Sequence, residues 1–162
     1  MKRPRIKIKP DRFDYIIESI TIIGLIVLFV LCIIYYGRLP DSIPTHFDLQ
    51  GNPNSYGSKG SIWFLPILGA ILYVGLTILS NYPHTFNYPV NITSENAARM
   101  YKKGIMILRL LKLIIIGLFL YINFKTIEIG LGISENISTI NLPVILAAFF
   151  GFAIFSIIWM KR

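Results

Sequence analysis

Apolar residues in this chain are gathered into four long blocks instead of recurring at helical or strand spacing. The blocks are nearly unbroken, and each approaches the roughly 20 residues that a helix needs to cross about 30 Å of hydrocarbon. They cover Ile20–Tyr36, Ile62–Leu79, Ile105–Phe124 and Leu142–Met160. We therefore predict an all-α integral membrane protein, a single membrane domain with four transmembrane helices at about 14–36, 62–80, 94–129 and 142–160.

Composition agrees with the block pattern. The 162 residues are 54% hydrophobic and 15% charged, with a mean hydropathy of +0.63, so the four blocks leave little chain for a water-soluble core. The first block ends without the small residues of a signal-peptide cleavage site, which predicts a retained helix. Cys32 is the single cysteine and lies mid-helix, so we expect neither an intrachain disulfide nor a cysteine-based metal site.

Basic residues are distributed unevenly between the two sides of the predicted membrane. All but three of the 16 Lys and Arg residues lie in the tail 1–13, around the start of the third helix or at the C-terminus. The exceptions are Arg38, Lys59 and Lys125. Because cytoplasmic segments are rich in Lys and Arg, we expect both termini in the cytoplasm and an ordered loop 37–61 outside. The formal charge of +8 then reflects topology, and we expect no nucleic-acid partner.

Four basic residues fall on one side of the third predicted helix. Arg99, Lys102, Arg109 and Lys112 lie within roughly 140° of one another at 100° per residue, which predicts a cytoplasmic basic face. Arg109 and Lys112 lie inside an apolar block, where charges often mark an ion pathway or a charged partner. We favour a second interpretation, in which their long side chains snorkel outward. The twelve uncharged residues between Lys112 and Lys125 span about 18 Å, and snorkelling covers the remaining thickness.

The polar segment Leu39–Lys59 joins the first two predicted helices and has three interpretations. In the first, His46, Asp41 and Asp48 bind a metal, but a catalytic zinc usually has three protein ligands, and His84 is expected on the opposite side. In the second, the segment recognises a peptide, a lipid headgroup or a partner subunit. In the third, prolines and glycines simply reverse the chain. We predict no catalytic residue, metal ligand or cofactor.

The stretch Leu39–Pro66, LPDSIPTHFDLQGNPNSYGSKGSIWFLP, resembles the signature Leu-Pro-x-x-(Ile/Val)-Pro-x-His-(Phe/Trp)-x-x-x-Gly-x-x-(Asp/Asn)-x-(Trp/Tyr)-Gly-x-Lys. That signature is typical of small bacterial membrane proteins with an uncharacterised domain, which forms the N-terminal part of SdpI-type immunity proteins. The Asn-rich start of the third helix, Asn91–Ile115, is similar to the same family. Asn54 and Tyr56 stand where the family often has Asp and Trp. The family-marker residues in this chain are Pro40, Pro44, His46, Phe47, Gly51, Asn54, Tyr56, Gly57 and Lys59.

The resemblance implies a short four-helix member of this family, in the bacterial inner membrane, without the additional helices of SdpI-type proteins. It implies a non-enzymatic protein whose outer loop recognises or shields against a secreted peptide, with a cytoplasmic surface that could bind a regulator. The runner-up is an accessory subunit of a larger membrane complex, and a membrane-embedded metal-dependent hydrolase is third. Expected partners are the lipid bilayer and a peptide or protein at the outer face or within the membrane.

Overall fold

The computed structural model describes residues 3–48, 50–137 and 142–161. The first two residues of the predicted tail, residue 49 of the predicted loop, the approach to the fourth helix (138–141) and residue 162 fall outside the described residues. Each of the four predicted ranges contains a helix, with ends shifted by about one turn or less. In chain order the elements are α1 (Arg12–Tyr35), β1 (Ser42–Phe47), β2 (Pro53–Ser58), the 3-10 helix η1 (Lys59–Trp63), α2 (Phe64–Ser80), the 3-10 helix η2 (Pro83–Thr85), α3 (Ala97–Gly130) and α4 (Leu142–Lys161).

Three of the described helical segments are long and apolar enough to cross a bilayer: α1, the continuous segment Lys59–Ser80, and α3. The last helix adds a shorter apolar stretch, Phe150–Lys161. Large apolar side chains on these helices point outward, and those of Ile33, Phe64 and Ile71 are each more than 60% exposed. Because an apolar surface of this extent is unfavourable in water, the arrangement indicates a helical membrane protein.

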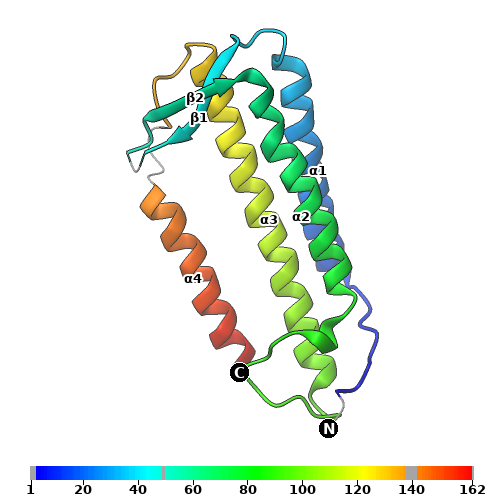
Figure 1. The fold of residues 1–162 in the computed structure, drawn as a ribbon. Helices are drawn as coiled ribbons and strands as arrows, with labels where there is room; N and C mark the ends of the chain where they lie inside the picture. Colours follow the sequence, from blue (N-terminus) through cyan, green and yellow to red (C-terminus); the bar gives the residue numbers. More distant parts are fainter. Residues whose placement is uncertain (1–2, 49, 138–141, 162) are drawn as a thin grey trace.

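The helices α1, α2 and α3 run side by side as a bundle, and α4 lies along the other side of α3 (Figure 1). At one end of the bundle, β1 and β2 form a cap over the helix ends. At the opposite end lie η2 and the N-terminal segment. There, Lys103 on α3 donates a hydrogen bond of 2.8 Å to the Trp159 carbonyl of α4 and lies 5.4 Å from the centre of the Trp159 ring.

The predicted outer loop contains a β-hairpin, so the all-α prediction is wrong at this point. The two strands are antiparallel, and their register pairs Ile43 with Gly57 and His46 with Ser55. The register shifts on either side of His46, as in β-bulges, which bend and twist a hairpin. The bend lets β1 follow the end of α3, with which it makes its main helix contacts.

The hairpin is held on the bundle by a buried apolar cluster. Ile43 of β1 and Leu39 before it pack with Cys32 of α1, Ile62 of η1 and Ile127 of α3. All five side chains are buried, and burying each Ile or Leu side chain contributes roughly 1.5–3 kcal/mol. The hairpin is therefore an integral cap of the bundle.

Reciprocal hydrogen bonds cap the start of α1 and stabilise the turn before α3. Asp11 is the N-cap of α1, where its carboxylate accepts from the Asp14 N–H at 3.0 Å, and Asp14 accepts from the Asp11 N–H at 2.8 Å. Two such bonds satisfy donors that a helix start leaves free. The Lys102 ammonium hydrogen-bonds the Asp11 carboxylate and holds the pKa of Asp11 below its usual range. Thr93 and Asn96 exchange similar bonds in the turn before α3. The helix itself begins at Ala97, about one turn after its predicted start at 94.

Pro66 in the first turn of α2 leaves one carbonyl without its usual donor. Proline has no N–H, so residue 66 cannot donate to the Ile62 carbonyl four residues earlier. Asn123 of α3 supplies the missing donor, with its Nδ2 3.0 Å from the Ile62 oxygen. The Asn123 side chain is 1% exposed. A neighbouring helix therefore compensates for the proline, as is common in membrane helices.

We expect Asn123→Ala to lower the free energy of unfolding by about 1–3 kcal/mol, because the buried Ile62 carbonyl would lose its amide donor. It would keep only the weak thiol donor of Cys32, whose Sγ lies 3.5 Å away. Pro66→Ala restores an N–H at position 66. In the background of Asn123→Ala, it should therefore recover part of the loss. The measurement is denaturant-induced unfolding in mild detergent for the wild type, both single variants and the double variant. If the losses in unfolding free energy of the two single variants simply added in the double variant, Asn123 would not be compensating for Pro66.

Candidate functional site

The predicted marker residues of the hairpin contact one another across the two strands. His46 Nδ1 lies 2.6 Å from Asn54 Oδ1, which joins β1 to β2 beside the register shift. Lys59 Nζ lies 2.9 Å from the Asp41 carboxylate and 5.8 Å from the centre of the Tyr36 ring. The hydrogen bond from Lys59 holds the pKa of Asp41 below its usual range. The side chains of His46 and Lys59 thus join the two strands and fix the base of the hairpin.

The turn between the strands is organised by Asp48. Its carboxylate accepts hydrogen bonds from the backbone N–H groups of Asn52 at 2.8 Å and Gln50 at 2.9 Å. The Asn52 N–H is the largest cause of a lowered Asp48 pKa. Gly51 has a φ of +84°, a left-handed conformation that favours glycine, and its carbonyl accepts from the Ile137 N–H at 2.8 Å. That bond ties the turn to the segment that follows α3.

A hollow of about 310 Å³ lies beneath the hairpin, between β1, the start of α2 and the C-terminal part of α3. Phe47 and Pro44 are the marker residues that line it, and His46, Asn54 and Tyr56 do not. Apolar side chains dominate the walls, and hydroxyl groups lie among them. The lining residues are Pro44, Thr45, Phe47, Ser61, Ile62, Phe64, Leu65, Ile122, Asn123 and Thr126. Such a mixture suits a ligand with an apolar body and a few polar groups.

A metal site at His46, Asp41 and Asp48 is one of the three interpretations of the loop. Asp41 is engaged by Lys59, and the Asp48 carboxylate by the turn backbone. Within the described ranges, no group of three or more His, Cys, Asp or Glu side chains is placed to hold a metal ion.

Arg109 and Lys112 do not snorkel outward; that prediction is wrong. Lys112 Nζ lies 2.7 and 2.8 Å from the two carboxylate oxygens of Glu18 on α1 and 2.9 Å from Thr77 Oγ1 on α2. The Lys112 side chain is 1% exposed. Arg109 forms ion pairs with both Asp14 and Glu18 on α1. The predicted basic face is thus divided: Arg99 and Lys102 are exposed, whereas Arg109 and Lys112 turn into the bundle.

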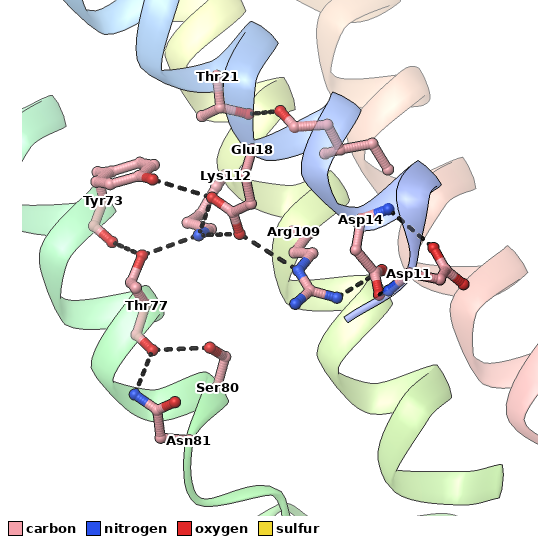
Figure 2. A network of polar contacts seen from close by, with 11 residues as sticks. Asp11, Asp14, Glu18, Thr21, Tyr73, Thr77, Ser80, Asn81, Arg109 and Lys112 are labelled. Atoms are coloured by element: carbon pink, nitrogen blue, oxygen red, sulfur yellow. Dashed lines mark hydrogen bonds and ion pairs between the residues drawn. The ribbon is translucent and has the colours of Figure 1, made fainter. Parts of the chain in front are cut away.

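These residues form a charge cluster that joins all three bundle helices (Figure 2). We define it as Asp14, Glu18, Tyr73, Thr77, Arg109 and Lys112. Tyr73 donates a hydrogen bond of 3.0 Å to Glu18, and its ring centre lies 4.5 Å from Lys112 Nζ.

The cluster pairs two acidic with two basic side chains, so its formal charge is zero. Isolated charges are very costly in a membrane, and charges that are paired and hydrogen-bonded are tolerated. Two atoms are less well placed: Asp14 Oδ1 and Arg109 Nε lie within ion-pair distance of partners but lack a hydrogen bond of good geometry. The arrangement fixes the positions of α1, α2 and α3 relative to one another. Its acidic half lies on α1, which the spacing of basic residues along the third helix does not reveal.

The sequence comparisons match the part of the chain that builds the cap. Residues 23–70 match a known family. It is described as "Domain of unknown function (DUF1648)". The match runs from the middle of α1 to the first half of α2 and includes the whole hairpin and every marker residue.

One relative is an "Uncharacterized protein" of Archaeoglobus fulgidus, 28% identical over 78 residues. The alignment covers 43% of this chain and 43% of that protein, so the chain spans less than half of the relative's length. No solved structure matches the chain.

Proposed function

We propose that this protein is a non-enzymatic, inner-membrane recognition protein whose hairpin cap faces outward and holds an apolar segment of a secreted peptide. The observation that carries the proposal is the hollow lined by Phe47, Phe64 and Ile122 beneath the hairpin. The resemblance of Leu39–Pro66 to SdpI-type immunity proteins supports a protective role. In that role, binding keeps a toxic peptide from acting on the membrane.

The geometry of the cap supports a peptide as the occupant. The hollow lies where the ends of α2 and α3 meet the hairpin, and its open side includes Phe64, which is 65% exposed. A peptide that partitions into the membrane surface would reach this side with its apolar face. Thr45 and Ser61, both exposed, offer hydroxyl groups to its polar face.

The charge distribution supports an outward cap. Apart from Arg38, Lys59 and Lys125, the basic residues belong to the part of the chain on the other side of the predicted membrane. Segments rich in Lys and Arg are retained in the cytoplasm. The hairpin lies at the end of the bundle opposite the N-terminal segment (Figure 1), so this orientation exposes it outside the cell.

The test is survival of cells that receive the peptide fraction of medium conditioned by their own wild-type strain. Deleting the gene should sensitise the cells, and the wild-type gene should restore survival. Phe47→Ala should restore it poorly, because loss of one aromatic anchor weakens binding by about tenfold or more.

Tyr56→Ala is the matched control, since Tyr56 is also an aromatic marker residue of the hairpin but does not line the hollow. It should protect like the wild type when both variants accumulate equally in membranes. Unchanged survival after deletion would refute the protective role. Equal protection by the two variants would refute the hollow as the binding site. Co-purification with a defined membrane complex, without peptide sensitivity, would favour an accessory subunit instead.

A further inference from the structure

A second hollow, of about 400 Å³, lies at the end of the bundle opposite the hairpin. It is bounded by the N-terminal segment, by the end of α2 with η2, and by Ile105 of α3. We call it the basic crevice. Its lining residues are Arg5, Ile6, Lys7, Ile8, Ser80, Asn81, Tyr82, Pro83, His84 and Ile105.

The walls of the basic crevice are held in place by contacts outside it. Arg3 donates to the carbonyls of His84 at 3.2 Å and Phe86 at 2.5 Å, which fixes the N-terminal segment against η2. Tyr101 of α3 donates to the Pro4 carbonyl at 2.9 Å. Ile8 packs on a buried cluster that includes Tyr88 and Met100. The N-terminal segment is therefore docked before any ligand arrives, which lowers the entropic cost of binding.

The charged side chains of the basic crevice are all of one sign. Arg5 and Lys7 line it beside His84, and the lining includes no acidic residue. Among the described residues, neither Arg5 nor Lys7 forms an ion pair with a carboxylate. The nearby acids of α1 are already engaged, Asp11 by Lys102 and Asp14 by Arg109.

The end of α2 offers little opposition to an anion. Carbonyls at a helix C-terminus carry partial negative charge, but here the Thr77 carbonyl accepts from Ser80 Oγ at 2.7 Å and from Asn81 Nδ2 at 3.3 Å. These side chains therefore offset part of the negative charge at the α2 end. Arginine and lysine side chains that lack a carboxylate partner bind phosphate strongly.

We propose that the basic crevice binds the phosphate group of an anionic phospholipid headgroup through Arg5 and Lys7. A lipid is the source of phosphate that fits the site, because Ile6, Ile8 and Ile105 add an apolar wall at the membrane end of the helices. Anionic lipids enrich the cytoplasmic leaflet, and basic pockets beside membrane helices bind their headgroups. The N-terminal segment thus forms one wall of a lipid site, a role more specific than a topology signal.

The test measures binding of fluorescent phosphatidylglycerol to the purified full chain in mild detergent, by anisotropy. Arg5→Gln with Lys7→Gln should weaken binding by about 30-fold, the effect of removing two basic residues near the headgroup. Lys9→Gln with Arg12→Gln removes the same charge from outside the crevice and should weaken binding by less than about threefold. Arg5→Lys with Lys7→Arg keeps the charge and should bind like the wild type.

Equal weakening by the two Gln pairs would overturn the crevice in favour of diffuse attraction. Phosphatidylcholine bears a phosphate but no net charge. If it bound as tightly as phosphatidylglycerol, the proposal would also be overturned. Inorganic phosphate is the third probe. Full competition by phosphate at concentrations matched to the lipid would assign the site to free phosphate, whereas failure to compete supports the lipid.

Discussion

Lys112→Met should be among the most destabilising single substitutions in this chain, with a loss of about 3–5 kcal/mol in the free energy of unfolding. The substitution removes the ammonium group that contacts both carboxylate oxygens of Glu18. Glu18 would then be left as a charge inside an apolar bundle, with only part of its partners. Breaking one side of a buried ion pair costs far more than the pair contributes. Unfolding by denaturant in mild detergent measures the loss.

A second substitution tests the cause of that loss. Adding Glu18→Gln to Lys112→Met removes the unpaired charge, so the double variant should recover a large part of the stability. Lys102→Met is the matched control: Lys102 also pairs with an acid of the α1 start, Asp11, but both side chains are largely exposed. It should have a much smaller effect. A double variant less stable than Lys112→Met would contradict the account of the charge cluster.

Gly51→Ala should displace the turn of the hairpin and lower the free energy of unfolding by about 2 kcal/mol or more. Alanine in a left-handed conformation costs about 1 kcal/mol. In addition, a Cβ at position 51 would lie 3.1 Å from the Ile137 carbonyl oxygen. Relieving that contact disturbs the hydrogen bond from the Ile137 N–H to the Gly51 carbonyl. Thermal unfolding in detergent, followed by circular dichroism, measures the change.

Gly132→Ala isolates the two contributions. Gly132 also has a positive φ, +71°, but a Cβ there would meet nothing within 4 Å. It should therefore cost only about 1 kcal/mol from the backbone conformation. If Gly51→Ala and Gly132→Ala destabilise the protein equally, the contact between the hairpin turn and Ile137 contributes nothing to its stability.

The helices could be predicted from the sequence because length and hydropathy alone decide whether a segment suits a bilayer. The hairpin could not. Its strands, SIPTHF and PNSYGS, contain proline, asparagine and glycine, which are infrequent in strands. Docking of Ile43 into the apolar cluster compensates for these weak local preferences. Tertiary packing therefore decides the structure of this segment.

The charge cluster shows a second limit of sequence reasoning. Along their own helix, the only relevant quantity for Arg109 and Lys112 is the distance to the membrane surface, which favours snorkelling. The direction in which the two side chains point depends on α1, which places Asp14 and Glu18 at the same depth in the bundle. The signal was present: the two acids are four residues apart and the two bases three, spacings that share a helix face. Pairing the two faces requires knowing that α1 packs on α3.

Figure 1 shows the hairpin at one end of the bundle and the N-terminal segment at the other. The first hollow lies beneath the hairpin, and the basic crevice lies beside the N-terminal segment. The charge cluster ties α1, α2 and α3 together between the hairpin and the N-terminal segment. A ligand at the hairpin would thus meet a cap held by helices of fixed register, which favours a preformed binding surface.

Site-specific photo-crosslinking at the hairpin tests the central proposal most directly. A benzoylphenylalanine is placed at Phe47, which lines the hollow, or at Tyr56, which does not. Irradiation follows addition of the secreted peptide fraction to intact cells. We predict an adduct of peptide size from position 47 that is absent from position 56 and absent without the peptide fraction. No peptide adduct from position 47, or equal adducts from both positions, would contradict peptide recognition at the hollow.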